Sequence, residues 1–335
     1  MTTPPTPGGG SSAAADPGSE ADRLLSPLRI GGLTLDRRLF MAPMAGITTS
    51  SFRESVRRWG AGLVFTEMIS AYGVHYGNRR TLDYFDCRPD EHPIGFQLFG
   101  ADAGVLAGAA AACVQAGADL VDLNMACPVR KVVKTGAGAA LLGDPQRAAG
   151  IVAAVVAAVG PAVPVTVKIR SGLREGDAAG VRAAPRLVDA GAAALCIHPR
   201  TASQLYRGLA DHRVTFALAA ELPVPVLASG DVDGRPAALA LLDGGAAAVM
   251  LARHTLGSPW LFGEVLGGAS PSAGERLAEL RRFVDDVLHT MGPRGVGYLR
   301  QFWPRYRRGG ALDKPLAQAL MQAPDIGIVR ALLAI

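Results

Sequence analysis

Several polar or reactive side chains stand directly after short apolar runs in the middle of this sequence. Cys127 follows one such run in a loop just before Pro128, and Lys168 and Arg170 close the next run. Each residue alone has an ordinary structural explanation, such as a satisfied hydrogen bond or an ion pair. Because most of the runs end in this way, we predict one shared pocket. Its other members are Gln97, Asn124, His198, Ser229, Gly230, Asp231, Ala252 and Arg253.

The residue types at two of these places favour a phosphate-bearing ligand. Gly230 and the Ala252–Arg253 pair follow the last two apolar runs, where backbone N–H groups and an arginine suit a phosphate. Lys168 suits a Schiff base or a cofactor contact, with a structural ion pair as the alternative. Cys113 and Cys196 fall inside a predicted helix and strand and suit a packed core.

The apolar runs themselves predict β-strands. They alternate with Ala-rich stretches long enough for crossover helices, such as Ala101–Ala116, Pro145–Val159 and Gly180–Ala190. This alternation is typical of a parallel sheet, and eight units within about 240 residues favour a closed (β/α)8 TIM barrel. In such a barrel the carboxyl ends of the strands meet around the active site. The predicted strands are Leu39–Ala42, Leu63–Thr66, Ile94–Leu98, Leu120–Asn124, Val165–Ile169, Ala194–Ile197, Val226–Ala228 and Ala248–Leu251.

The length of 335 residues accommodates such a barrel and a smaller second domain. We predict a disordered tail over residues 1–22, a barrel over 23–268 and a helical domain over 271–335. In the last of these, five arginines are interleaved with four aromatic residues, which suits contact with RNA. A solvated basic face over an aromatic core explains the same pattern. The residues are Arg294, Arg300, Arg305, Arg307, Arg308, Tyr298, Phe302, Trp303 and Tyr306.

Composition narrows the functional classes. A net charge of +5 permits a nucleic-acid partner without requiring one. The four cysteines include no Cys-x-x-Cys pair, so we expect no metal site, no disulfide framework and a cytoplasmic setting. No signal peptide is recognised, and the longest apolar stretch, Ile151–Val167, is interrupted by Gly160 and two prolines. We therefore expect no membrane span and no stable protein partner.

The motifs together resemble those of the tRNA-dihydrouridine synthases, especially the bacterial-type enzymes. The resemblance runs from about Leu24 to Phe262, with the motifs in the family's order and spacing. Its most specific block is N-x-x-C-P-x-x-K-V, over Asn124–Val132. Further matching segments are A-P-M-A-G-I-T (Ala42–Thr48), S-F-R (Ser51–Arg53), F-Q-L-F-G (Phe96–Gly100), I-H-P-R-T (Ile197–Thr201), Q-L-Y-R-G-L-A-D (Gln204–Asp211) and V-M-L-A-R (Val249–Arg253).

The resemblance implies FMN at the top of the barrel, NADPH as the reductant and tRNA as the substrate. Reduced FMN would give hydride to C6 of a uracil that has left its stack, and Cys127 would give a proton to C5. A thiol suits this task because it is mostly protonated at neutral pH. By position, Pro43, Met44 and Ala45 would pack beside the flavin, and Gln97 and Lys168 would bind its ring edge. His198, Ser229, Gly230, Asp231, Ala252 and Arg253 would surround its phosphate, and Asn124 and Arg170 would contact the target uracil. In the C-terminal segment, which resembles the family only loosely, Arg300 and Arg305 are the predicted RNA contacts.

Three positions depart from the family pattern. Ser229 stands where the family usually has Asn, and Ala252 and Ala126 stand where it usually has Gly. If position 126 requires a positive φ, alanine there would cost about 1 kcal/mol and could displace Cys127.

Other readings stay open. An FMN-dependent small-molecule reductase of dihydroorotate or dihydropyrimidine type would not need the basic C-terminal domain. A non-catalytic RNA-binding barrel would not need Cys127, Lys168 and Gln97. A phosphate-sugar aldolase or isomerase would use Lys168 differently, and the protein would be colourless.

Overall fold

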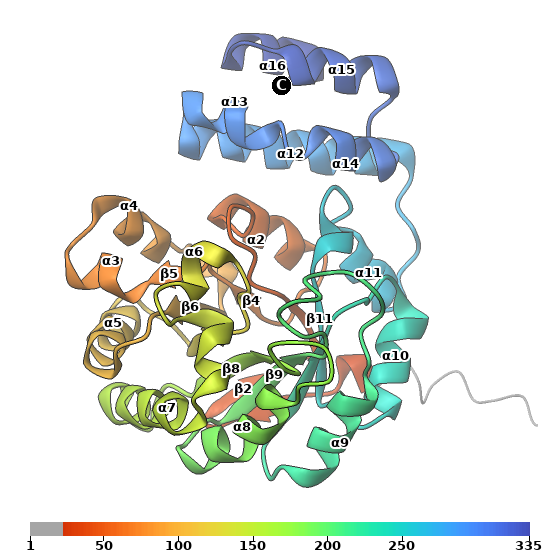
Figure 1. The fold of residues 1–335 in the computed structure, drawn as a ribbon. Helices are drawn as coiled ribbons and strands as arrows, with labels where there is room; N and C mark the ends of the chain where they lie inside the picture. Colours follow the sequence, from red (N-terminus) through yellow and green to blue (C-terminus); the bar gives the residue numbers. More distant parts are fainter. Residues whose placement is uncertain (1–22) are drawn as a thin grey trace, which may run out of the picture.

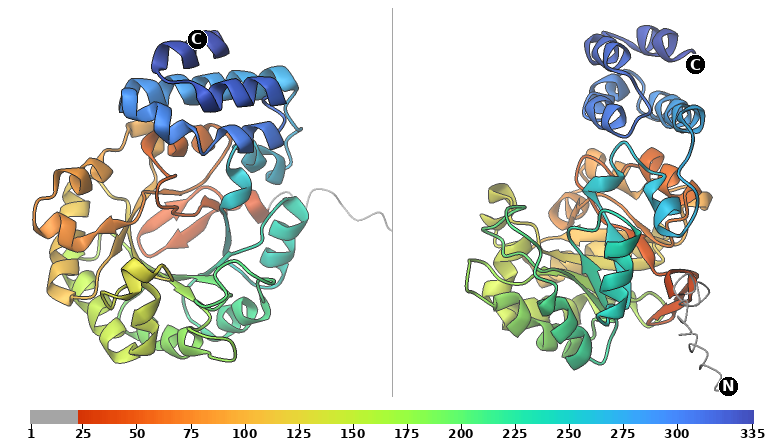
Figure 2. Two further views of the ribbon diagram at one scale, coloured as in Figure 1. Left: turned by 45° about the horizontal axis from the view of Figure 1, so that its top comes forward. Right: turned by 90° about the vertical axis from the view of Figure 1, so that its right-hand side faces the viewer.

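The computed structural model describes residues 23–335, and the predicted tail over residues 1–22 lies outside them. Figure 1 shows a barrel of alternating strands and helices with a layer of further helices on one side. The views in Figure 2 show that this layer, coloured blue, is stacked on the barrel as a distinct body. The predicted TIM barrel with a C-terminal helical region is therefore confirmed.

Parallel strands form the barrel, in the order β3-β11-β10-β9-β8-β7-β6-β4. A bridge between Phe40 and Leu63 links the two ends of this path and brings the ring close to closure. The strands fall within one or two residues of their predicted positions, and a short β5 (Ile69–Ser70) pairs with β6 in addition. Their bounds are β3 (Leu39–Met41), β4 (Val64–Phe65), β6 (Ile94–Phe99), β7 (Leu120–Met125), β8 (Val165–Arg170), β9 (Ala194–His198), β10 (Val226–Ser229) and β11 (Ala248–Leu251).

Helices link the strands and pack around the barrel. The predicted crossover helices are present as α5, α7 and α8, and α7 begins and ends at the predicted residues. Between β5 and β6 the chain makes an excursion of short helices that the sequence analysis did not resolve. The helices of the barrel are α2 (Ser50–Arg58), α3 (Ala71–His75), α4 (Arg79–Leu82), α5 (Ala103–Gln115), α6 (Arg130–Val133), α7 (Pro145–Val159), α8 (Ala179–Asp189), α9 (Arg213–Glu221), α10 (Arg235–Asp243) and α11 (Leu261–Val265).

Side chains alternate between two environments along each strand, as the period of a β-strand requires. On β8, Val165, Val167 and Ile169 pack in the core between strands and helices. Lys168 and Arg170 lie on the opposite face and reach the central cavity. Because side chains on a strand repeat every two residues, Lys168 and Arg170 both face the mouth of the central cavity.

An antiparallel hairpin of β1 (Leu28–Ile30) and β2 (Leu33–Leu35) fills the amino end of the barrel. Its apolar side chains belong to the barrel's inner core, with Phe40, Leu120 and Met250. At the turn, Gly31 has a φ of +55°, and a Cβ there would lie 3.0 Å from that of Pro164. This hairpin was not predicted from the sequence.

The C-terminal helices form a layer around an aromatic core. Phe302, Trp303 and Tyr306 are fully buried, so these three form an aromatic core and the predicted contact of aromatic residues with RNA is wrong for them. The arginines between them remain at the surface or partly buried. The helices are α12 (Ala273–Met291), α13 (Pro293–Leu299), α14 (Trp303–Arg308), α15 (Lys314–Gln322) and α16 (Ile326–Leu333).

None of the helices in residues 23–335 has the length and apolar character needed to cross a membrane.

Candidate functional site

A cavity of about 680 Å³ opens at the carboxyl ends of the barrel strands. The loops after β3, β7, β9, β10 and β11 supply most of its lining. Gln97 and Arg300 are absent from the lining, whereas every other predicted site residue belongs to it. Those residues are Pro43, Met44, Ala45, Asn124, Cys127, Lys168, Arg170, His198, Ser229, Gly230, Asp231, Ala252, Arg253 and Arg305.

The Asn124 side chain holds the loop that carries Cys127. Its Oδ1 accepts hydrogen bonds from the N–H groups of Ala126 at 3.1 Å and Cys127 at 2.8 Å, while its Nδ2 donates to Gln97 Oε1 at 2.9 Å. The backbone at Ala126 does not have a positive φ, so alanine at this position costs no backbone strain. Asn124 therefore orients Cys127 whether or not it also contacts a substrate.

Burial raises the pKa of the Cys127 thiol above its usual value. A hydrogen bond from the backbone of Val129 and the positive charge of Arg170 act in the opposite direction but do not outweigh burial. The thiol is half-buried at the side of the cavity and is therefore protonated at neutral pH. A protonated thiol facing a cavity can act as a proton donor.

Below the cavity lies a buried polar chain that the sequence analysis did not identify. Gln97 Nε2 donates to Asp122 Oδ2 at 2.6 Å, and Thr166 Oγ1 donates to Asp122 Oδ1 at 2.7 Å. Burial raises the pKa of Asp122 to about 6. Asp122 stands two residues before Asn124 on β7, so the two side chains lie on the same face of the strand. This spacing is the sequence signal from which the inward position of Asp122 could have been predicted. The chain leads from Asp122 through Gln97 and Asn124 to the Cys127 loop.

Positive charge gathers in the same cavity around His198. Arg200 Nη1 lies 3.2 Å from His198 Nε2; because a guanidinium only donates, the imidazole accepts there and is neutral. Burial, followed by the charges of Arg170, Lys168, Arg200 and Arg253, lowers the pKa of His198 to about 2. Such a surplus of positive charge favours an anionic ligand.

Arg200, part of the I-H-P-R-T motif for which no role was predicted, organises the loop near this cluster. It makes a bidentate pair with Asp231, at 2.8 and 2.7 Å. Within residues 23–335, Asp231 is the single acidic side chain lining the cavity. Asp231 pairs with Arg200 and also lies 3.7 Å from Arg253, so Lys168 and Arg170 remain, in the described part of the chain, as unpaired positive charges toward a bound anion.

Gly230 brings the backbone close to His198. It has a φ of +116°, and a Cβ at this position would lie 2.8 Å from His198 Cδ2. Both facts require glycine here. The neighbouring Ser229 and Ala252 line the same part of the cavity with small side chains, which leaves room for a ligand against the backbone.

Arg170 connects two of the loops around the cavity. Its Nη1 donates to the carbonyl oxygen of Leu205 at 2.7 Å, and its Nε lies 3.3 Å from that of Ala126. The neighbouring Tyr206 lies at the mouth, with the Arg253 guanidinium 4.2 Å from its ring centre. In the structure, Arg170 joins the loops after β7 and β9 through these contacts. Its predicted contact with the substrate stays a prediction.

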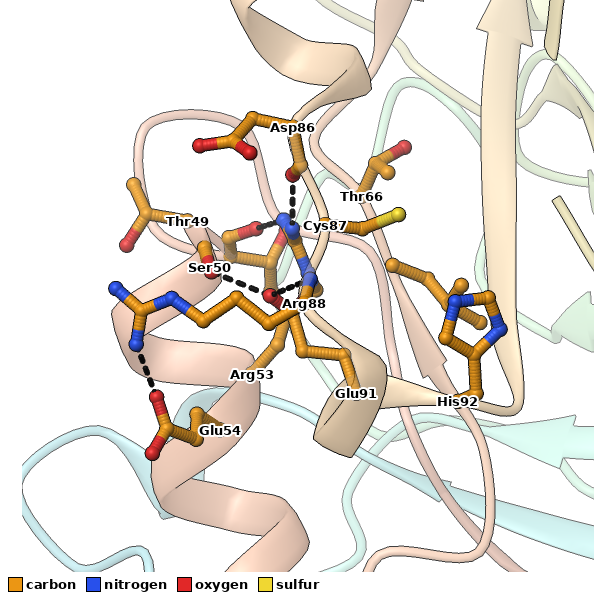
Figure 3. Close-up of polar contacts among 12 residues, drawn as sticks. Thr49, Ser50, Arg53, Glu54, Thr66, Asp86, Cys87, Arg88, Glu91 and His92 are labelled. Carbon is orange, nitrogen blue, oxygen red and sulfur yellow. Dashed lines mark hydrogen bonds and ion pairs between the residues drawn. The ribbon is translucent and has the colours of Figure 1, made fainter. Parts of the chain in front are cut away.

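A buried ion pair supports the loop after β3. Arg53 pairs with Glu91, which also accepts a hydrogen bond from Ser50 (Figure 3). Arg53 Nη1 donates to the carbonyl oxygen of Thr48 at 2.6 Å, and Nη2 to that of Asp86 at 2.9 Å. The loop that supplies Pro43 to Ile47 is thus tied to α2 and to the segment before β6.

Residues 40–293 match the family model described as "Dihydrouridine synthase (Dus)". The chain belongs to the dihydrouridine synthase family. It is 39% identical to a probable tRNA-dihydrouridine synthase of Synechocystis over 306 residues, covering 88% of this chain and 84% of the relative. It is 41% identical to tRNA-dihydrouridine synthase B of Xanthomonas campestris over 239 residues, or 71% of each chain. The enzyme class, an oxidoreductase acting on uridines of tRNA, follows from this membership.

Solved structures with a similar fold are more distant in sequence. Morphinone reductase is 18% identical, with a TM-score of 0.53, over 75% of this chain and 91% of its own. Histamine dehydrogenase from Rhizobium is 16% identical, with a TM-score of 0.57, over 72% of this chain and 47% of its own. These likenesses support the barrel fold. For this dihydrouridine synthase, the family match ends at residue 293, so α14 to α16 lie beyond it.

Proposed function

We propose that this dihydrouridine synthase reduces uridines of tRNA to 5,6-dihydrouridine, with FMN as its cofactor, NADPH as its reductant and Cys127 as the proton donor. The observation that carries the proposal is the placement of Cys127. Its protonated thiol shares one cavity with a cluster of positive charge built around His198 and Gly230. A proton donor and an anion site in one cavity are what the reaction requires.

The residues of the cavity fit FMN. Its phosphate would lie against the backbone of Gly230 and Ala252, with Arg253 as a charged partner. Pro43, Met44 and Ala45 supply an apolar wall for a flat ring, and Lys168 supplies positive charge toward the reduced ring. When bound, FMN supplies the hydride for C6 of uracil. Gln97 does not line the cavity, because its side chain is bonded to Asp122 and Asn124 beneath it. Its predicted contact with the flavin ring therefore requires Asn124 to move aside.

The proton for C5 comes from Cys127 in this proposal. Burial keeps the thiol protonated, and Asn124 fixes the backbone from which it extends. Arg170 braces the same loop from the other side. Correct placement of a general acid matters because proton transfer requires hydrogen-bonding distance.

The surface around the mouth suits tRNA. Arg130, Lys131 and Lys134 are exposed directly after the Cys127 loop, and the segment from Ala126 to Gly143 contains no acidic residue. Arg305 reaches the cavity from α14. We assign tRNA binding to this face and to the helical region over 271–335, with Arg300 and Arg305 as phosphate contacts. A tRNA substrate also implies a cytoplasmic protein.

The decisive experiment incubates tRNA with the purified full chain, FMN and NADPH, and measures dihydrouridine by mass analysis of the nucleosides. Cys127→Ala is the matched control. We expect dihydrouridine with the wild type and the loss of most of it in the variant, although NADPH still reduces the variant's flavin. A yellow protein that leaves tRNA unchanged would refute the proposal and favour a small-molecule reductase.

A further inference from the structure

We propose that Tyr298 of α13 and Gln301, in the turn between α13 and α14, are positioning residues for the flavin-binding loop, so that tRNA binding and FMN binding reinforce each other. The inference rests on the proposed function. Its subject is the loop between β3 and α2, which supplies Pro43, Met44, Ala45 and Ile47 to the cavity.

Three successive carbonyl groups of this loop accept hydrogen bonds from side chains of other elements. Gly46 O accepts from Gln301 Nε2 at 3.0 Å, Ile47 O from the Tyr298 hydroxyl at 2.7 Å, and Thr48 O from Arg53 at 2.6 Å. Two of these three donors belong to the C-terminal helical region, Tyr298 on α13 and Gln301 in the turn after it, and one belongs to the barrel. The C-terminal helices therefore help to define the conformation of a loop that forms the wall of the active-site cavity.

The loop also has internal hydrogen bonds, from the N–H groups of Ile47 and Thr48 to the carbonyl oxygen of Met44, but its Gly46 is not held by packing. Gly46 has a φ of +72°, and a Cβ there would meet nothing within 4 Å, so packing does not fix it. Its N–H donates to the carboxylate of Glu67, which lies on the barrel side. The peptide at Gly46 is thus held between Glu67 of the barrel and Gln301 of the helical layer.

Tyr298 is itself held rigidly. Its ring lies 5.1 Å from that of Phe302, which packs in turn against Phe52 and Phe283. The hydroxyl also lies 3.0 Å from Thr49 Oγ1. Burial raises the pKa of Tyr298, so the hydroxyl keeps its proton for Ile47. A movement of α13 is passed directly to the loop through this contact.

The same helices carry the arginines assigned to tRNA. Arg300 and Arg307 are exposed, and Arg305 lines the cavity from α14. One face of this segment would therefore contact RNA phosphates while Tyr298 and Gln301 hold the flavin-binding loop. Binding at either place favours the same arrangement of the helices and the loop, and such coupling is reciprocal by thermodynamic necessity.

The test measures the affinity of the full chain for tRNA by filter binding, with and without saturating FMN. The variants are Tyr298→Phe, which keeps the ring, and the double variant Tyr298→Phe with Gln301→Ala. The ratio of the tRNA affinity with FMN to that without FMN measures the coupling. We expect this ratio to be roughly five or more for the wild type, a typical coupling between sites, and near one for the double variant. Thermal unfolding checks that the variants remain folded.

Thr290→Val is the matched control. Thr290 Oγ1 lies 3.3 Å from Ser51 Oγ across the same interface, away from the flavin-binding loop. We expect this variant to keep the wild-type ratio. In addition, tRNA should change the visible absorption of bound FMN in the wild type and the control, but not in the double variant.

The outcomes separate this inference from the proposed function. A wild type that forms dihydrouridine but binds tRNA equally well with and without FMN overturns the inference alone. So does a double variant that keeps the wild-type ratio, or a control that loses it. A wild type that binds neither FMN nor tRNA overturns both.

Discussion

Cys127 is protected from ionisation by its surroundings, and this leads to a prediction about pH. Because burial raises the pKa of the thiol, its acid form persists above the pKa of about 8.5 that a free cysteine has. We expect the single-turnover rate of uridine reduction by prereduced enzyme to stay constant through neutral pH and to fall only at more alkaline pH than 8.5. Reduction of the flavin by NADPH serves as the control, and its rate should not show this fall at alkaline pH. A decline that begins below pH 8 would contradict the assignment.

Asn124 holds the Cys127 loop through two backbone N–H groups. Asn124→Ala leaves these partly buried donors without a partner, which should lower the free energy of unfolding by about 1–3 kcal/mol. Formation of dihydrouridine should fall further than flavin reduction does. Urea denaturation and nucleoside analysis measure the two effects. Asn124→Asp keeps the acceptor oxygens and should lose less stability; equal losses would contradict the role of Oδ1.

Asp122 makes stability depend on pH in a predictable direction. Its folded pKa of about 6 exceeds the value of about 3.9 for an unfolded aspartate, so its protonation favours the folded state. That contribution is present below about pH 4 and is lost as the pH rises through about 6. Asp122→Asn should therefore remove about 1 kcal/mol from the difference in unfolding free energy between pH 5 and pH 7.5. Replacement of the exposed Asp83 by Asn should leave the difference unchanged.

At the level of elements, the turn after β10 requires its glycine. Gly230→Ala would place a Cβ 2.8 Å from His198 Cδ2 at a φ of +116°, so we expect a loss of about 1–3 kcal/mol of stability. FMN affinity should fall as well, because the turn forms part of the proposed phosphate site. Gly234→Ala, in the same loop, has no positive φ and no contact closer than 3.7 Å. Flavin titration should show a lower FMN affinity for Gly230→Ala than for Gly234→Ala. A similar loss of FMN affinity in both variants would contradict the role of the Gly230 turn in the phosphate site.

The sequence predicted the barrel strands well because their signals are local and repeated. Apolar runs and strand-end polar residues placed Lys168, His198 and Arg253 at one mouth, where the structure has them. Arg200 and Asp122 were missed because their importance lies in partners distant along the chain.

Elements with little local signal were missed as well. The β1–β2 hairpin has strands of three residues, too short for a clear alternation, and only its packing in the barrel stabilises it. The aromatic residues of α14 were misassigned because a sequence of aromatic and basic residues is equally compatible with a core and a binding face. Tertiary burial decided between them.

At the scale of the whole molecule, basic residues from several elements line the cavity mouth, among them Lys168, Arg170, Arg253 and Arg305. If Arg305 contacts a phosphate of tRNA, Arg305→Gln should reduce the slope of log affinity against log salt by about 0.7–0.9. Arg29→Gln changes an exposed arginine of the hairpin at the opposite end and should leave the slope unchanged. Binding isotherms at several salt concentrations measure both. An equal change in both variants would indicate a general charge effect instead of a contact.

The contact between α2 and α12 has a consequence for how the protein is made. The helix that joins β3 to β4 is α2, and its Phe52 packs against Phe283 of α12. Its Ser55 bonds to Glu279, which is 224 residues further along the chain. During synthesis, the outer face of α2 therefore stays uncovered until α12 has been made. Contacts between residues so far apart in the sequence form late in folding. A nascent chain truncated before α12 would leave Phe52 of α2 exposed, and an exposed apolar side chain makes such an intermediate prone to aggregation.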